Sequence, residues 1–437
     1  MADYGDLTTI IGQMNRAAID CWMADQDFFP TWGYEETYTK WHFAPYQYFR
    51  PAADGSGGGD GVGYDVSCAD AFDGIRSSID SIVSKWHGLP DGAGARAYAD
   101  AGRITASLLG SNGAGSSVQN SGSISTSSGT IQDVVVGNME GAFRRPFLSK
   151  YFTAFSSVQN GLGQAAVILA ANYAAQQAMW GAVKADVATI CDNARLAWEK
   201  QAAEESAANT TFQLQVVGAV VTAVAAVVTA PAGLTGAVAG LSATSAGISM
   251  ALSEVARDGI DIGGESYEDI LASLSDALDK LNATITTQEE ILNDAMQEAI
   301  AAMTSDAQSY NLDAFQLGEY PLGDGSMRMD VTDAGIVSDN MRLVHEELAE
   351  AASAIGTGPA SSPTPRSAGI GVAPTGTHAT ASQLHGLTSK YLQDTRDEYE
   401  RGHRLFDATV ADFFATDAAA RQTVQQLLAD EALTGQS

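Results

Sequence analysis

The sequence has few positive charges. Its 437 residues include 23 Lys and Arg against 53 Asp and Glu, a formal net charge of −30. A nucleic-acid-binding surface needs clustered Lys and Arg to pair with phosphates, so we expect no nucleic-acid partner. The hydrophobic content is 45%, which excludes disorder of the chain as a whole.

Cysteine is scarce, and an N-terminal signal is missing. Three cysteines, Cys21, Cys68 and Cys191, are too few for a disulfide framework. The first residues lack the basic region and the apolar run of a secretory signal peptide. We therefore expect a protein that stays in the cytoplasm or leaves it by a route that reads another signal.

Motifs that carry chemistry are absent from the sequence. It contains no His-Glu-x-x-His, no Gly-x-Ser-x-Gly and no phosphate-binding Gly-x-x-x-x-Gly-Lys loop. The six histidines do not have the spacing of a metal site. We expect no enzyme, and we assign no catalytic, cofactor-binding or metal-ligating residue and no cofactor.

Charge is missing altogether from four stretches, 104–132, 151–183, 206–253 and 367–389. The first is rich in Ser and Gly and predicts a loop over 111–132. The second is apolar all round and predicts a buried helix within a bundle over 133–205. The fourth adjoins several prolines and predicts a Pro/Gly linker over 357–380.

The third uncharged stretch predicts an apolar Ala/Gly hairpin over 206–253. Pro231 divides it into two halves within 212–252, each about long enough to cross a bilayer. Val220 lies within the first half, and Gly236 and Gly240 form a GxxxG that permits close helix contact. Two interpretations stay open, a hairpin buried in a soluble bundle and a hairpin that enters a membrane.

An acidic segment over 254–316 predicts coiled-coil-like helices. Leu271, Leu274, Leu278, Leu281 and Ile285 alternate steps of three and four residues. The acidic face opposite this stripe is expected to be solvated or to dock on a basic partner surface.

The N-terminal quarter predicts three further segments. Residues 1–50 are rich in aromatics, which pack locally or form an exposed surface for a partner or glycan. Residues 51–65 form a Gly-rich connector. In 66–110, two stretches with helical apolar spacing flank Trp86 and Gly88, which predicts a helical hairpin that reverses at this turn.

This hairpin resembles the WxG superfamily, small helical-hairpin proteins exported by type VII (ESX) secretion systems. The resemblance rests on Trp86 and Gly88 and on the Ala-rich helix that follows with Tyr98. A second hairpin is expected at the C-terminus, from 330–356 and 381–430, split by the linker. It resembles the end of secretion-associated substrates, whose Tyr-x-x-x-Asp/Glu export signal would be matched by Phe413 and Asp417, with Phe in place of Tyr.

The resemblance implies an elongated, all-α bundle with long coiled-coil-like helices and WxG-type hairpins. It implies a non-enzymatic protein made in the cytoplasm and then secreted or displayed at the cell surface without a cleaved signal peptide. Such a protein would associate with a small WxG-type helical partner or chaperone, a secretion ATPase, or a second copy of itself. Two alternatives remain: a membrane-active protein, pore-forming or membrane-anchoring, that uses 212–252, and a cytoplasmic structural helical protein.

Overall fold

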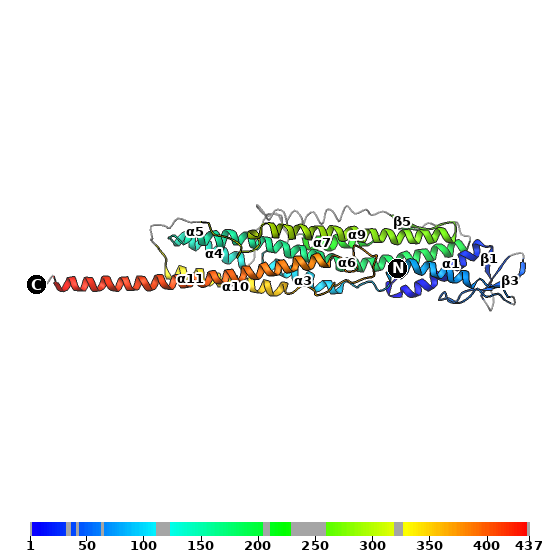
Figure 1. Ribbon diagram of the computed structural model, residues 1–437, viewed down its shortest axis with the longest axis horizontal. Coiled ribbons are helices and arrows are strands. Elements are labelled where there is room, and N and C mark those ends of the chain that lie inside the picture. Colours follow the sequence, from blue (N-terminus) through cyan, green and yellow to red (C-terminus); the bar gives the residue numbers. More distant parts are fainter. Residues whose placement is uncertain are drawn as a thin grey trace.

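The structure is a computed structural model, which describes residues 2–31, 36–40, 43–62, 65–110, 123–203, 210–228, 259–318 and 327–434. The chain is mostly helical, which confirms the predicted all-α class apart from short strands. Figure 1 shows the helices aligned along one long axis. The elements are α1 (Leu7–Asp25), β1 (Phe28–Thr31), β2 (Thr37–Lys40), β3 (Phe43–Phe49), α2 (Ala69–Val83), α3 (Ala93–Leu108), α4 (Ser123–Asn138), α5 (Arg144–Leu148), α6 (Phe155–Ala202), β4 (Thr210–Gln213), α7 (Val216–Val228), β5 (Gly259–Ile262), α9 (Tyr267–Ser305), α10 (Val331–Ile355) and α11 (His378–Thr434), with short turns of 3-10 helix at Tyr4–Asp6, Ser84–Trp86 and Ala307–Ser309 and of π-helix at Ser149–Ala154.

Helix α6 is the axis of the bundle. Its 48 residues correspond to a length of about 72 Å. Helices α1, α3, α7 and α9 all pack along it, and its small residues let neighbours approach closely. A Cβ on Gly102 of α3 would lie 2.9 Å from the Ala166 carbonyl oxygen, so α3 needs glycine at this crossing.

Helix α9 runs antiparallel to α6. At one end the Trp198 indole donates to the Tyr267 carbonyl oxygen at 3.3 Å, and further along Gln176 donates to Glu289 at 3.3 Å. The buried face of α9 contains Leu274, Leu278, Leu281 and Ile285, four of the five residues in the predicted stripe, while Leu271 is only partly buried. Ser266 caps the helix by accepting a hydrogen bond from the Asp269 amide at 3.2 Å.

Helix α2 runs in the same direction as α9. Phe72, near the start of α2, packs against α1, whose last residue, Asp25, accepts a hydrogen bond from the Tyr267 amide at the start of α9. Lys85, just after α2, lies 3.7 Å from Asp279, further along α9.

Helix α3 also runs antiparallel to α6, which corrects the predicted hairpin over 66–110. A Cβ on Gly92, before α3, would lie 2.7 Å from the Gln177 carbonyl oxygen, and Leu109, after α3, accepts from Gln159 at 2.9 Å. Helices α2 and α3 therefore point the same way, and the chain does not reverse at Trp86 and Gly88. The reason is that α2 packs on α1 whereas α3 packs along α6, so α3 does not fold back onto α2.

The aromatic-rich segment corrects the expectation of helices alone. Strands β1, β2 and β3 form an antiparallel sheet in that order. Aromatic and Thr side chains favour a pleated surface over a helix. Tyr38 of β2 is fully buried and donates to Asp20 on α1 at 2.6 Å, so this residue supports the local-packing interpretation of the aromatics.

Helix α4 begins inside the stretch predicted as a loop, which is a second correction. Residues 111–122 lie outside the described residues, but 123–132 are helical. Ile124, Ile131 and Val135 are buried, and α4 packs on α10. Burial of these three side chains overrides the weak helix propensity of the surrounding Ser and Gly.

Helices α10 and α11 pack antiparallel. His385 Nε2 lies 3.1 Å from the Ile355 carbonyl oxygen at one end, and Ser338 Oγ lies 3.0 Å from His403 Nε2 near the other. Helix α11 then continues past the other elements as a single projecting helix (Figure 1).

Candidate functional site

The uncharged stretch 206–253 is tethered between the two longest central helices. Strand β4 follows α6 and strand β5 precedes α9, and the two strands pair antiparallel from Thr210↔Ile262 to Gln213↔Gly259. Ser273 of α9 donates to the Asp261 carbonyl oxygen at 3.0 Å. The ribbon is thus anchored on α9, and within the described part of the predicted acidic segment 254–316 strand β5 precedes the helix.

Helix α7 is the described part of the predicted apolar hairpin. Val216, Val220 and Val224 are buried, and α7 packs mainly on α6, whereas Val221 is only partly buried. Its 13 residues span about 20 Å, less than a bilayer core. Among the residues that the structure describes, no helix is long and apolar enough to cross a membrane.

The second half of that hairpin contains the remaining predicted residues. Pro231, Gly236 and Gly240 lie outside the described residues. Membrane entry by 212–252 therefore stays a prediction.

A buried carboxylate holds the start of α7. Asp186 projects from α6 and is 1% exposed. Its two oxygens accept hydrogen bonds from the Gln215 amide, each at 3.0 Å, and one of them accepts from the Val216 amide at 3.1 Å. A helix start leaves its first amides without intrahelical partners, so Asp186 caps α7 from another helix.

Burial changes the acidity of Asp186. Desolvation raises the pKa of its carboxyl group to about 6, while the hydrogen bonds from Gln215 and Val216 act in the opposite direction. Sequence reasoning missed this residue. The feature that could have pointed to it is its position, because it is the first acidic residue after the uncharged stretch 151–183.

A shallow groove runs beside α7. It has a volume of about 790 Å³ and lies between α3, α6 and α7. Ala178, Ala182 and Ala219 line it, with Arg96 and Arg103 on the α3 side. Helix α7 therefore does not fill the small-residue surface of α6 that it lies on.

The predicted linker 357–380 is an ordered strap, which is a third correction. Arg366 reaches Glu289 of α9 in an ion pair whose two side chains are both 0% exposed. The Arg366 guanidinium also lies 4.7 Å from the centroid of the Trp180 ring on α6 and donates to the Ile370 carbonyl oxygen at 2.9 Å. A buried, paired charge fixes the strap although its composition is that of a linker.

Backbone amides of the strap complete this network. Val372 N donates to Glu289 at 3.0 Å and Gly371 N donates to Asn282 at 2.8 Å. Desolvation raises the pKa of Glu289, and Arg366 opposes this shift. The sequence signal for the pair was a lone Arg between prolines and an acid beside the apolar stripe of α9.

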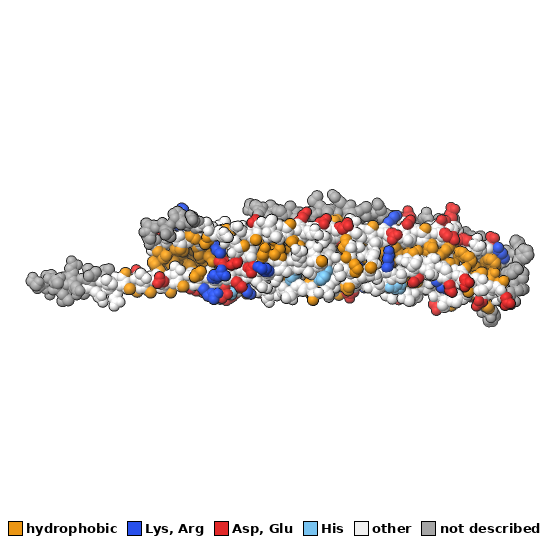
Figure 2. All heavy atoms as spheres, viewed as in Figure 1, with side chains coloured by type: hydrophobic (Ala, Val, Ile, Leu, Met, Phe, Trp, Pro, Cys, Tyr) orange, Lys and Arg blue, Asp and Glu red, His pale blue; other side chains and the backbone are white. Residues whose placement is uncertain are grey.

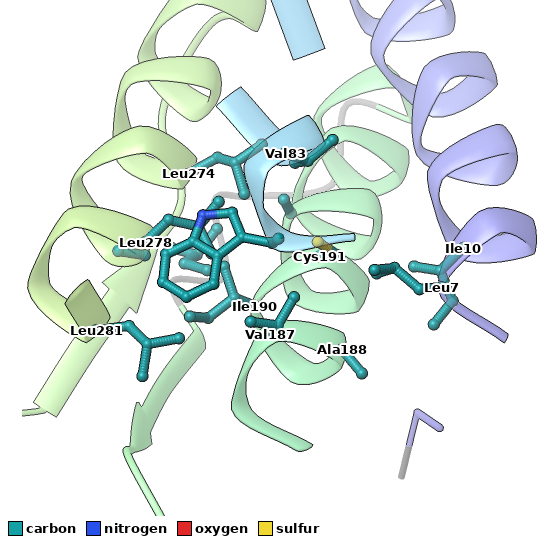
Figure 3. Close-up of a cluster of buried hydrophobic side chains, with 14 of the residues drawn as sticks. Leu7, Ile10, Val83, Val187, Ala188, Ile190, Cys191, Leu274, Leu278 and Leu281 are labelled. Atoms are coloured by element: carbon teal, nitrogen blue, oxygen red, sulfur yellow. The ribbon is translucent and has the colours of Figure 1, made fainter. Parts of the chain in front are cut away.

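The Trp-x-Gly turn has its Trp inside the bundle, whereas His87 and Gly88 are exposed. Trp86 is fully buried, and its carbonyl oxygen accepts from the Tyr4 hydroxyl at 2.5 Å, which in turn accepts from the Leu89 amide at 3.1 Å. Gly88 has φ +69, a left-handed conformation that favours glycine. The surrounding cluster joins Val83, Val187 and Leu278 (Figure 3), so Trp86 and Gly88 stabilise this end of the bundle.

The predicted export residues lie where α11 leaves the bundle, with Phe413 packed on the end of the core. Phe413 is partly buried and its ring packs against Phe414 at a centroid distance of 5.2 Å. Asp417 pairs with Arg421 at 2.9 Å and is partly exposed. Phe413 and Asp417 therefore share a face of a helix that other proteins can reach.

Metal ligands and clustered charges are the remaining groups that could support chemistry. Within the described ranges no group of three His, Cys, Asp or Glu could hold a metal ion. A cavity of about 650 Å³ is lined by Arg16, Asp20, Arg50, Arg195 and Glu199. Its arginines pair with carboxylates, which is an arrangement of structural ion pairs.

Comparisons with known proteins add no family. No protein-family model, no curated protein and no solved structure matches the chain.

Proposed function

We propose that this is a non-enzymatic protein, exported by a type VII (ESX-like) secretion system, that acts by association of its helices with a partner or with a second copy. In this proposal α11 is the contact element of an elongated, coiled-coil-like bundle. The protein is made in the cytoplasm and is then secreted or displayed at the cell surface without a cleaved signal peptide.

The projecting end of α11 is the observation that supports this proposal. Along the bundle the apolar face of α11 is buried at Leu384, Leu392, Tyr399 and Phe406. The face continues to Phe413, which is only partly buried where it packs on the end of the core. Leu405, also on α11, is 61% exposed. Figure 2 shows hydrophobic side chains gathered where α11 leaves the bundle. A single helix in water is marginally stable, so a second helix that covers this face would stabilise it.

Three kinds of partner would contact α11 in this proposal. A small WxG-type helical partner or chaperone would cover the apolar face of α11. A secretion ATPase would read Phe413 and Asp417, which are one helical turn apart. A second copy would pair through the same face.

The amount of protein in the culture medium of the producing cells tests export. We expect Phe413→Ala with Asp417→Ala to lower the secreted amount at least tenfold while the cellular amount is unchanged. Asp412→Ala, an exposed acid on the same helix, is the matched control. Secretion at the original level in the double variant would contradict the signal, and absence of the original protein from the medium would favour a cytoplasmic structural protein.

A membrane-active role, pore-forming or membrane-anchoring, is the second candidate. It is supported by α7, an apolar helix that lies on the bundle surface and belongs to an uncharged stretch hung on the β4–β5 ribbon. Helix α7 can leave the bundle surface without moving α6 or α9.

Dye release from vesicles of anionic and zwitterionic phospholipid tests this second role. We expect release by the full chain and its loss in Val221→Glu, which places a charge on the partly exposed face of α7. Ser81→Glu adds the same charge at an exposed site on α2 and should release dye like the original chain. No release by the original chain at any pH or lipid composition would reject the role.

A further inference from the structure

We propose that Asp186 is a latch that seats α7 on α6, and that α7 opens as a unit when this contact is lost. The purpose of such an opening rests on the proposed membrane role, but the latch itself is a property of the fold and is tested separately.

The position of Asp186 is the first argument. Its carboxylate is buried on an otherwise apolar part of α6, and burying a charge is costly unless it is paired or hydrogen-bonded. Among the described residues no basic side chain forms an ion pair with it, and the hydrogen bonds that it accepts come from Gln215 and Val216. Every hydrogen bond recorded for this side chain thus goes to the start of α7, and α6 gains none from it.

The open flank of α7 is the second argument. Within the described part of α7 the buried side chains are Val216, Val220 and Val224. The groove of about 790 Å³ along its flank removes further contacts. Within the described residues no other helix covers α7 on this flank, so it is held by its contacts with α6 and by the cap from Asp186.

The independent anchoring of the ribbon is the third argument. Strands β4 and β5 pair with each other, and Ser273 ties β5 to α9 through the Asp261 carbonyl oxygen and the Gly263 amide. None of these bonds involves Asp186. Loss of the latch therefore frees α7 while the base of the segment stays bound.

Hydrogen exchange of the full chain, followed by mass spectrometry on peptides from 217–228, tests the latch. Asp186→Ala leaves the Gln215 and Val216 amides without their partner, and we expect about fivefold to thirtyfold faster exchange in these peptides, the size of a lost helix cap. Peptides from α9 should exchange as before. Asp192→Ala is the matched control, because Asp192 lies on the same helix and pairs with Arg195.

A second variant approaches the contact from the other side. Val216→Pro removes one of the latched amides at the first position of α7, where proline is tolerated. We expect it also to speed exchange, and we expect the double variant with Asp186→Ala to fall short of the product of the two single effects, because both remove the same contact.

Hydrogen exchange and dye release together distinguish the Asp186 latch from the membrane role. Unchanged exchange of 217–228 in Asp186→Ala, or equal acceleration in α7 and α9, would overturn the latch. Faster exchange confined to α7 supports the latch, with or without dye release from vesicles. Faster exchange in α7 without dye release would keep the latch and reject the membrane role.

Discussion

Two segments with few charges lie against the central helices, the strap 357–380 and helix α7, and they are held in different ways. The strap around Arg366 is bound by a fully buried ion pair with Glu289, a ring contact with Trp180 and backbone amides. Helix α7 is bound by valine contacts and by the cap from Asp186. The sequence of both segments lacks charge over long runs, yet only the strap is fastened by a pair of opposite charges.

The two segments differ in the free energy that opening each of them would cost. Opening the strap would leave Glu289 or Arg366 buried without its partner or would expose both, and either change is costly. Opening α7 exposes a carboxylate to water, where it is well solvated. We therefore expect the strap to stay closed under conditions in which α7 opens.

The largest effect should come from breaking the strap. Arg366→Ala leaves the Glu289 carboxylate buried without its partner, and we expect a loss of about 3–5 kcal/mol in the free energy of unfolding. Urea denaturation of the full chain measures it. Arg342→Ala, which removes a half-exposed pair with Glu346, should cost less than about 1 kcal/mol.

The double variant Glu289→Leu with Arg366→Met sharpens this prediction. It replaces the pair by apolar side chains and should recover most of the stability. Equal losses in Arg366→Ala and Arg342→Ala would show that the buried pair does not hold the strap.

The next effect is the pH dependence of α7. The docked pKa of Asp186 is about 6, against an ordinary value of 3.8. A raised pKa in the docked state means that docking is strongest below about pH 4 and weakens as the pH rises through 6, by up to about 3 kcal/mol. Exchange of 217–228, corrected for intrinsic rates, should therefore be faster at pH 8 than at pH 5.

Asp186→Asn is the control for this dependence. It cannot ionise, so the corrected exchange in α7 should no longer change between pH 5 and pH 8. A pH dependence that survives in Asp186→Asn would assign the effect to another group, such as Asp100 or Lys184 nearby on α3 and α6.

The smallest effect concerns the end of the strap. The Thr377 hydroxyl donates to Asn172 at 2.9 Å, and both residues are buried. Thr377→Val removes this bond at nearly constant volume and should cost about 1 kcal/mol. Ser362→Ala removes an exposed bond to the Thr375 carbonyl oxygen and should be close to neutral. A Thr377→Val variant as stable as the original chain would confine the strap's fastening to the ion pair.

Sequence reasoning succeeded where a single helix determines its own pattern. The stripe from Leu274 to Ile285 predicted the buried face of α9, because helical spacing alone decides which side chains share a face. It failed where packing against a distant segment determines the local structure. The hairpin expected at Trp86 and Gly88 is absent because α2 packs on α1 while α3 packs on α6. The loop expected over 111–132 is partly helix because α4 packs on α10.

In the candidate site, too, contacts between distant residues could not be predicted from the sequence. Val220 was found because its stretch has no charge, and it is buried on α6. Asp186, Glu289 and Arg366 were missed, because a charged residue in a sequence is expected at the surface. Only the packing that buries it shows that it has a partner.

The helical class, the apolar faces and the uncharged stretches follow from the sequence alone, because helix propensity and the spacing of apolar residues act within one segment. The tertiary structure decided the direction of α2 and α3, the closure of the strap and the seating of α7. These depend on desolvation and on hydrogen bonds between residues far apart in the chain, such as Asp186 with Val216 and Glu289 with Arg366. Such energies exist only once the surrounding helices have excluded water.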